Sequence, residues 1–437
     1  MKRIVTLIMV AAGYTLIAWE PVMMKCVEGE PWNVMVTESG GKTWTLEVKK
    51  PDYISVTRER YEKFPDYTPE GWGGWGKGVR LRQLHAQECS SAGALEPESV
   101  RIESEDGVLY EAGRDYDGNS EWGSFGRLKE GRIPPNATVL ISYRYSPQRL
   151  DSVICNTAGK LSIRCGKPHM AVPLPPELEA GEVRVGNIYL CGRPKQLTEE
   201  MLFPVLETAY PENAKLGETA AALLPKTLEK LRSGKAVKVL AWGDSVTDGS
   251  FLADPSWRWQ EVFVAGLSKR FATKNIELVT VGWGGASTRS YFTAPSGDFF
   301  NYQKRVLDES PDLVIMEFVN DAFLPQEELE ANYGRAYRDL KRIGAELILL
   351  TPHYIRPDWM GLKSQRNIDR DPRRYVAFLR KFAAANNIAI ADASLRYGRL
   401  WRRGIPYNTL MQNNVNHPDK RGMKLFSESL LELFPEK

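Results

Sequence analysis

Residues 237–249 read Val-Lys-Val-Leu-Ala-Trp-Gly-Asp-Ser-Val-Thr-Asp-Gly, and this stretch decides the fold of the second half of the chain. Its apolar run is typical of a parallel strand that is covered on both faces. The run ends in a short polar turn that holds Ser245, and residues 256–271 then show apolar positions at helical spacing. The order strand, turn, helix places a hydroxyl near the carboxyl end of a strand, where open parallel sheets bind their ligands.

The rest of the second half alternates in the same way. Compact apolar runs at 276–282, 312–318, 346–351 and 388–393 predict strands, and the apolar stripes of 326–344 and 371–387 predict helices between them. Such alternation indicates a parallel sheet with helices on both faces. Because crossover connections are right-handed, few topologies remain, and we expect a flavodoxin-like strand order 2-1-3-4-5 in a three-layer αβα domain over residues 236–437.

The first half reads as β-structure. Between residues 26 and 195 apolar and polar residues alternate in short runs that turns interrupt, a pattern that favours an all-β, sandwich-like domain. Residues 196–235 read as a linker with a connecting helix at 223–231. The stretch Gly71-Trp-Gly-Gly-Trp-Gly-Lys77 imitates a nucleotide-binding loop, but no strand precedes it and no helix follows. We interpret it as a loop with two exposed tryptophans. Whether these tryptophans contact a sugar is left open.

Composition excludes several classes of protein. Lysine plus arginine number 58 against 55 acidic residues, so the net charge of +3 carries no nucleic-acid signature. The five cysteines and four histidines show no zinc-type spacing, and no cofactor or metal is expected. Cys155 and Cys165 are the pair to test for a disulfide bond, with five ordinary thiols as the alternative.

The amino terminus resembles a bacterial secretory signal. Met-Lys-Arg is followed by the apolar run 4–18, so residues 1–25 are a candidate signal peptide and the protein is expected to be secreted or periplasmic. A buried strand is the alternative. No other segment is apolar enough to cross a bilayer, and no pattern indicates an oligomeric state.

Polar residues follow the predicted strands at positions that would share one cleft. They are Asp244 and Ser245, the run 282–288 (Gly-Trp-Gly-Gly-Ala-Ser-Thr), Asn320 and Asp321, and His417 before the last helix. A serine becomes a strong nucleophile when a base, most often histidine, takes its proton. The oxyanion that forms needs preorganised donors, which a glycine N–H, the serine N–H and an asparagine amide provide.

These blocks resemble those of the SGNH/GDSL hydrolases. Gly243-Asp-Ser-Val-Thr-Asp-Gly249, Gly285, Asn320-Asp321 and His417-Pro418 correspond to the motifs of that family, over about residues 235–437. The resemblance implies ester hydrolysis through an acyl-enzyme, with Ser245 as nucleophile and His417 as base. It also implies that Ser245, Gly285 and Asn320 line the oxyanion hole. The flanking residues Asp244, Trp283, Gly284 and Asp321 are expected to contact the substrate.

The sequence departs from that family at one place. The family usually has aspartate three residues before the histidine, where this chain has Asn414. Asparagine can accept a hydrogen bond from the imidazole but cannot stabilise the imidazolium by charge; an Asp-to-Asn change in a serine protease costs about 10⁴ in kcat. Three outcomes stay open: a Ser–His dyad oriented by Asn414 or a backbone carbonyl, a substitute acid such as Asp419, or a weakened enzyme. We favour the dyad, because the domain order is similar to that of two-domain carbohydrate esterases in which a β-sandwich precedes the hydrolase domain.

Two features bear on the substrate. Aromatic residues that follow predicted strands could rim the cleft and stack on sugar rings, or pack in the core: Trp283, Tyr291, Phe292, Phe323, Tyr354 and Trp359. The arginine-rich insertion 353–374 could contact an anionic glycan or be a solvated loop. The leading hypothesis is an exported esterase that removes acetyl or similar short acyl groups from a polysaccharide. A lipid or small-ester acylhydrolase is one alternative, and a non-catalytic carbohydrate-binding protein with a decayed site is another.

Overall fold

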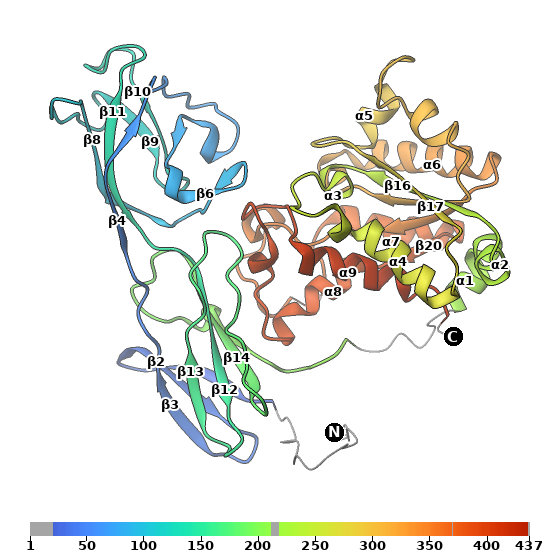
Figure 1. Cartoon of the computed structure of the whole chain (residues 1–437), viewed down its shortest axis with the longest axis horizontal. Coiled ribbons are helices and arrows are strands. Elements are labelled where there is room, and N and C mark those ends of the chain that lie inside the picture. Colours follow the sequence, from blue (N-terminus) through green and yellow to red (C-terminus); the bar gives the residue numbers. More distant parts are fainter. Residues whose placement is uncertain (1–20, 211–217, 369, 436–437) are drawn as a thin grey trace. The chain divides into compact units, whose positions relative to one another are not determined.

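The computed structural model describes residues 21–210, 218–368 and 370–435, which form two compact units (Figure 1). The β-rich unit comprises the described residues of 1–84, 92–208 and 402–405. The α/β unit comprises the described residues of 85–91, 209–401 and 406–437. The short segment 85–91, although it lies in the first half of the sequence, therefore belongs to the α/β unit.

The α/β unit is built on a parallel sheet of five strands. They are β16 (Val237–Gly243), β17 (Ile276–Gly282), β18 (Leu313–Glu317), β19 (Glu346–Leu350) and β20 (Ala389–Ala391). Their order is β17-β16-β18-β19-β20 and every neighbouring pair is parallel. In chain order this is 2-1-3-4-5, so the predicted flavodoxin-like topology is confirmed.

Helices cover both faces of this sheet (Figure 1). One face packs against α5 (Thr288–Thr293), α6 (Gln326–Arg342) and α7 (Arg374–Asn386) through a cluster that includes Trp242 and Met316 of the sheet. Successive strand residues point to opposite faces, so Val239 and Ala241 face the other layer. That layer holds α4 (Trp259–Phe271), α8 (Ala393–Arg399) and α9 (Lys420–Leu431), in which α9 packs against both α4 and α8. The three-layer αβα prediction is confirmed.

The helix expected at 223–231 is divided in two. Helix α1 spans Glu218–Leu223 and α2 spans Pro225–Ser233, with Leu224 between them. Proline has no N–H to donate and is best tolerated in the first turn of a helix, so Pro225 starts α2.

The β-rich unit consists of antiparallel sheets, as its alternating sequence predicts. One pair of sheets is β1 (Met23–Val27), β2 (Glu30–Thr37) and β3 (Thr43–Glu47) with β13 (Leu161–Arg164), β12 (Arg149–Cys155), β14 (Val183–Leu190) and β15 (Leu202–Pro204). The other pair is β4 (Ile54–Tyr61), β11 (Val139–Tyr145) and β8 (Leu95–Glu103) with β5 (Val79–Arg80), β10 (Ser124–Arg127) and β9 (Tyr116–Asn119). Each pair shares its own hydrophobic cluster, so the layers of this unit close around separate cores.

The glycine-rich stretch 71–77 differs from its prediction in one respect. Trp72 is 73% exposed, but Trp75 is only 6% exposed and lies in a short 3₁₀ helix, Gly74–Gly76. Its ring packs edge-on against that of Trp122, with centroids 4.6 Å apart. The expectation of two exposed tryptophans is therefore wrong for Trp75, because a tertiary contact with a distant ring buries it.

Three other predictions concern a disulfide bond, the amino terminus and membrane spans. Cys155 and Cys165 are free thiols, so the disulfide bond between them is not formed. The candidate signal peptide lies almost entirely in residues 1–20, outside the described part of the chain. Within the part that the structure describes, no helix combines the length and apolar character that a membrane span requires.

Candidate active site

The serine turn lies at the carboxyl end of β16. Ser245 is the first residue of the short helix α3 (Ser245–Asp248), and Asp244 caps it by accepting a hydrogen bond from the N–H of Val246 at 3.0 Å. The turn is held close to the sheet: a Cβ on Gly243 would lie 2.1 Å from Oγ1 of Thr247 and 2.2 Å from the carbonyl oxygen of Glu317. Only glycine fits there, which explains why this residue type precedes the serine turn.

Hydrogen bonds tie the serine turn to the ends of the two neighbouring strands. Asn320, in the 3₁₀ helix Val319–Phe323 after β18, donates its backbone N–H to Oδ2 of Asp244 at 3.1 Å. Its side-chain amide donates to the carbonyl oxygen of Ala286, in the loop after β17, at 3.0 Å. The structure thus brings together the segments that carry Ser245, Gly285 and Asn320, all three of which the sequence placed in the oxyanion hole.

The loop after β17 is open at its glycines. Gly284 and Gly285 are exposed, and a Cβ on either would meet no atom within 4 Å. Gly285 has a φ of 74°, a conformation that glycine adopts without strain and that turns its backbone relative to the preceding residue. Trp283 donates its backbone N–H to the carbonyl oxygen of Gly243 at 3.2 Å, so the loop is anchored to β16 while its glycines face solvent.

Two of the expected substrate contacts are instead buried supports. Asp244 and Asp321 are both fully buried. Asp321 accepts a hydrogen bond from the N–H of Thr288 at 2.8 Å and so holds the start of α5. Burial raises the pKa of Asp244 to about 6 and that of Asp321 to about 7, against the lowering effect of their backbone hydrogen bonds. We reassign both residues from substrate contact to support of the turns, because neither side chain reaches the surface.

His417 lies in a turn that one asparagine organises. The side-chain oxygen of Asn413 accepts hydrogen bonds from the N–H groups of Val415, Asn416 and His417 at 2.9, 2.9 and 3.0 Å. The imidazole stacks on the ring of Phe251, with centroids 4.2 Å apart and planes at 7°. Since Phe251 follows closely after α3, the histidine lies against the loop that leads out of the serine turn.

Glu88 lies beside His417, and the sequence analysis missed it. Its Oε1 is 3.0 Å from Nδ1 of His417 and accepts a hydrogen bond from the side-chain amide of Asn413 at 2.7 Å. Burial acts to raise the pKa of Glu88, but the contacts with His417 and Asn413 prevail and lower it to about 2. No local signal could have found this residue, because 325 positions separate Glu88 from Asn413 and no motif surrounds it.

Asp419, the substitute acid that the sequence left open, has a different role. Asp419 caps α9 by accepting hydrogen bonds from the N–H groups of Arg421 and Gly422 at 2.9 and 3.1 Å, and it pairs with the Arg421 guanidinium at 2.7 Å. Asn414 is buried and has a φ of 61°. Asp419 is thus engaged in starting a helix, and the carboxylate at Nδ1 of His417 is that of Glu88.

The aromatic residues divide between surface and core. Phe323 is 68% exposed and Trp359 is 38% exposed. Trp283 is half-buried and stacks on Phe300, with centroids 4.5 Å apart. Phe292 is also partly buried and packs against the core, whereas Tyr291 and Tyr354 are fully buried. The prediction that aromatic residues could rim the site therefore fails for the two tyrosines, whose rings belong to the core.

Two arginines of the arginine-rich insertion form ion pairs within it. Arg373 is nearly buried, lies 2.5 Å from Asp371 and donates to the carbonyl oxygen of His353 at 2.8 Å. Arg356 lies 2.7 Å from Asp358. These two arginines already have carboxylate partners within the insertion, which weakens the hypothesis of an anionic glycan.

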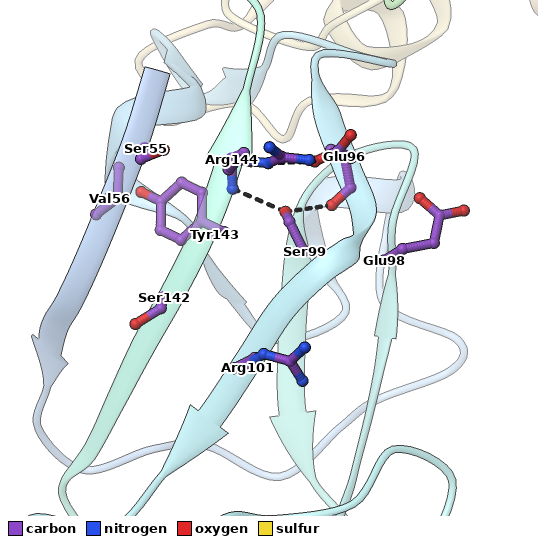
Figure 2. Close-up of a pocket in the computed structure, with 9 residues that line it drawn as sticks. All are labelled: Ser55, Val56, Glu96, Glu98, Ser99, Arg101, Ser142, Tyr143 and Arg144. Atoms are coloured by element: carbon purple, nitrogen blue, oxygen red, sulfur yellow. Dashed lines mark hydrogen bonds and ion pairs between the residues drawn. The ribbon is translucent and has the colours of Figure 1, made fainter. Parts of the chain in front are cut away.

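A concavity lies in the β-rich unit, over β4, β8 and β11 (Figure 2). Arg144 and Glu96 form an ion pair across it, and Ser99 links the same two strands by accepting from the N–H of Arg144 at 2.7 Å and donating to the carbonyl oxygen of Glu96 at 2.6 Å. It is lined by Ser55, Val56, Glu96, Glu98, Ser99, Arg101, Ser142, Tyr143 and Arg144. It holds no paired nucleophile and base, so the serine turn of the α/β unit remains the candidate catalytic site.

Comparison with known proteins agrees with this location. Residues 241–425 match the model of the GDSL-like lipase/acylhydrolase family. No curated protein matches the chain. A solved two-domain esterase (CEX) active on acetylated mannans is similar at 18% identity and a TM-score of 0.40, over 48% of this chain and 52% of that one. The chain thus spans about half the length of that protein.

Two further solved structures are similar to this chain over nearly their whole length. A lipolytic protein of the G-D-S-L family from Veillonella parvula is 21% identical with a TM-score of 0.35, over 46% of this chain and 98% of that one. A carbohydrate acetylesterase family member from Sinorhizobium meliloti is 16% identical with a TM-score of 0.30, over 45% and 95% of the two chains. Together with the family match and the parallel sheet, the serine turn identifies residues 241–425 as a GDSL-like lipase/acylhydrolase domain.

Proposed function

We propose that the protein is a serine esterase that removes acetyl or other short acyl groups from a carbohydrate. The observation that carries the proposal is the hydrogen-bonded assembly of three strand ends around Ser245, in which Asp244 and Asn320 fix the turns after β16 and β18. An ester hydrolase needs its nucleophile and its oxyanion donors held in this way before the substrate arrives.

The reaction proceeds in two halves. His417 takes the proton of the Ser245 hydroxyl as the oxygen attacks the ester carbonyl, and the backbone N–H groups of Ser245 and Gly285 with the Asn320 amide stabilise the oxyanion. The protonated imidazole then gives its proton to the leaving sugar hydroxyl, which leaves an acyl group on Ser245. Water, deprotonated by the same imidazole, hydrolyses this acyl-enzyme and restores the serine.

The surroundings of the turn favour a bulky alcohol component. The exposed Gly284 and Gly285 leave the approach to the turn open, and Phe323, three residues after Asn320, presents an exposed ring. The flat apolar face of an aromatic ring at an open site suits the face of a sugar ring. A short acyl group fits the proposal because the core cluster behind the turn is filled by side chains such as Trp242 and Tyr291.

A lipid or small-ester acylhydrolase is the second candidate. The family description covers lipases as well as acylhydrolases, and Phe299 adds an exposed ring, 60% accessible, to that of Phe323. Two large apolar side chains at the surface would suit an acyl chain as well as a sugar.

One set of assays separates the candidates. The purified protein is incubated with p-nitrophenyl acetate, p-nitrophenyl decanoate and an acetylated oligosaccharide, beside Ser245→Ala and, as a matched control, Ser256→Ala. We expect acetate release from the first and third substrates, lost in Ser245→Ala and retained in Ser256→Ala. A preference for the decanoate supports the lipid alternative. Absence of turnover on all three contradicts the esterase proposal and favours a carbohydrate-binding protein with a decayed site.

A further inference from the structure

The imidazole of a catalytic histidine needs a partner on the nitrogen that does not face the nucleophile. That partner fixes the tautomer and stabilises the positive charge that forms during the reaction. The position three residues before His417, which holds aspartate in the hydrolases that the chain resembles, holds the neutral Asn414 here. The position that usually supplies the charged partner of the base is therefore neutral in this chain.

We propose that Glu88 is the positioning carboxylate of His417, supplied by a hairpin from the first half of the chain. This inference rests on the proposed function. Oε1 of Glu88 lies 3.0 Å from Nδ1 of the His417 imidazole, the nitrogen on which such a partner acts. Asn413, whose side-chain oxygen organises the histidine turn, holds the same Oε1 through its amide at 2.7 Å. One asparagine thus fixes the histidine backbone and the carboxylate relative to each other.

The hairpin is built to present this residue. Strands β6 (His85–Ala86) and β7 (Cys89–Ser90) pair antiparallel, with Gln87 and Glu88 as the two-residue turn between them. Gln87 has a φ of 54°, at the place where such a turn prefers glycine. A non-glycine residue is strained in this region, and such strain persists where surrounding contacts over-determine the backbone.

Those contacts reach the active site. The side-chain amide of Gln87 donates to the carbonyl oxygen of Phe251 and to Oε1 of Gln412, both at 2.9 Å. Phe251 stacks on the imidazole, and Gln412 precedes the turn that carries it. The tip of the hairpin therefore contacts the histidine site from two directions, through Gln87 on the flanking segments and through Glu88 on the imidazole itself.

With Glu88 in this role, the positive charge that forms on His417 during the reaction has a negative partner. The negative charge of Glu88, 3.0 Å from Nδ1, favours the tautomer that is protonated there, so Nε2 keeps a lone pair and takes the proton of Ser245. The imidazolium that forms carries a positive charge beside the negative charge of Glu88, and no proton moves to the carboxylate. With a pKa of about 2, Glu88 stays ionised over the pH range in which a histidine base works.

The exposure of the Glu88 side chain separates two possible roles of this residue: positioning of the His417 imidazole and stabilisation of the fold. Its side chain is 47% exposed, and ion pairs that are open to water contribute little to folding. Removal of its charge is therefore expected to change turnover far more than the melting temperature. A residue with a structural role would show the opposite.

The first test compares Glu88→Gln, Glu88→Asp and the control Glu327→Gln, an exposed carboxylate of α6, in p-nitrophenyl acetate hydrolysis. We expect Glu88→Gln to lower kcat by about 10²-fold or more with KM changed less than threefold, by analogy with the loss of charge at a catalytic triad. Glu88→Asp regains at least tenfold of the loss, and Glu327→Gln stays within twofold of wild type.

A second measurement does not need turnover. The chain has four histidines, so ¹⁵N-histidine labelling gives few imidazole signals, and His417→Gln assigns the one of interest. We expect a low-field Nδ1 proton signal in the wild type that is absent in Glu88→Gln. Should Glu88→Gln fail to fold, the wild-type signal and the activity of Glu88→Asp still decide.

The outcomes separate this inference from the proposed function. If Glu88→Gln keeps kcat within twofold of wild type while Ser245→Ala is inactive, the esterase stands and the role of Glu88 is overturned. If the wild type hydrolyses no ester but shows the Glu88-dependent Nδ1 signal, the contact stands and the proposed function fails. An Nδ1 signal that is unchanged in Glu88→Gln overturns the inference in either case.

Discussion

The imidazole of His417 stacks on the ring of Phe251, with the two planes at 7° and their centroids 4.2 Å apart. Phe251 lies just beyond the serine helix α3, and its carbonyl oxygen accepts a hydrogen bond from Gln87. The ring of Phe251 therefore restricts the imidazole to one plane. The hydrogen bond from Gln87 fixes the backbone of Phe251 itself. The stacking contact joins the segment of the predicted nucleophile to the segment of the predicted base.

Loss of the Phe251 ring should leave the His417 imidazole less precisely positioned. We expect Phe251→Leu to lower kcat for p-nitrophenyl acetate by about tenfold with little change in KM, because catalytic geometry is lost while the approach to Ser245 stays open. Leu395→Ala, at an exposed apolar side chain of α8, serves as the control and should keep kcat within twofold. Equal activity of the two variants would show that the stacking does not position the histidine.

Asn320 is expected to act on the oxyanion through its side chain. Asn320→Ala removes one donor and should lower kcat by about 10²- to 10³-fold. The control is Asn332→Ala, which removes a side-chain hydrogen bond to Thr288 outside the proposed oxyanion hole. Steady-state kinetics and a thermal melt of both variants check the prediction, and a loss that follows the melting temperature in both would point to a folding effect alone.

Gly243 should tolerate no side chain. A Cβ there would lie 2.1 Å from Thr247 Oγ1 and 2.2 Å from the Glu317 carbonyl oxygen, so Gly243→Ala forces the serine turn away from β18. We expect the free energy of unfolding, measured by urea denaturation, to fall by about 3 kcal/mol or more. Gly284→Ala, where a Cβ meets no atom within 4 Å, should change it by less than about 1 kcal/mol. Comparable losses in both variants would contradict the packing argument.

His353 makes stability depend on pH. Burial, with the nearby Arg373 charge, lowers the pKa of this fully buried histidine to about 3, while Nε2 lies 2.8 Å from the carbonyl oxygen of Asn416. Because the folded pKa lies below the unfolded value of about 6.5, only the unfolded chain takes up this proton between those values. Stability is therefore lost as pH falls through that window, at up to about 1.4 kcal/mol per pH unit.

The variant His353→Gln keeps an amide donor for Asn416 but cannot titrate. We expect its free energy of unfolding to decline less steeply than that of the wild type between pH 6.5 and 4, whatever its stability at pH 7. Urea denaturation at several pH values measures both slopes. Parallel slopes would show that His353 is not the group responsible.

The architecture of the α/β unit could be predicted because its signals are short-range. Each strand is a local apolar run, each helix carries a local stripe such as Leu329, Tyr333 and Leu340, and right-handed crossovers restrict the strand order. The motif residues Ser245, Gly285 and Asn320 follow strand ends directly, so the topology alone brings their segments to one edge of the sheet. Their catalytic roles remain predictions that the variants above test.

The surroundings of individual side chains could not be predicted in the same way. Asp321 stands beside Asn320 in the sequence, yet its carboxylate is buried and holds Thr288. Tyr291 and Tyr354 follow strands as Phe323 does, but only Phe323 is exposed. Whether such a residue faces a cleft or a core depends on elements that pack against it from distant parts of the chain.

Local patterns in the sequence predict a parallel sheet with a serine at its edge, an antiparallel front half and a histidine that lacks the usual aspartate. The identity of the carboxylate that lies against that histidine follows from the tertiary structure alone. Glu88 lies in a two-residue turn with no motif around it. Its contact with His417 joins two segments that are far apart in the chain, and no sequence pattern links them. Local patterns report the period of a strand or helix, whereas this contact depends on where the folded chain places a hairpin.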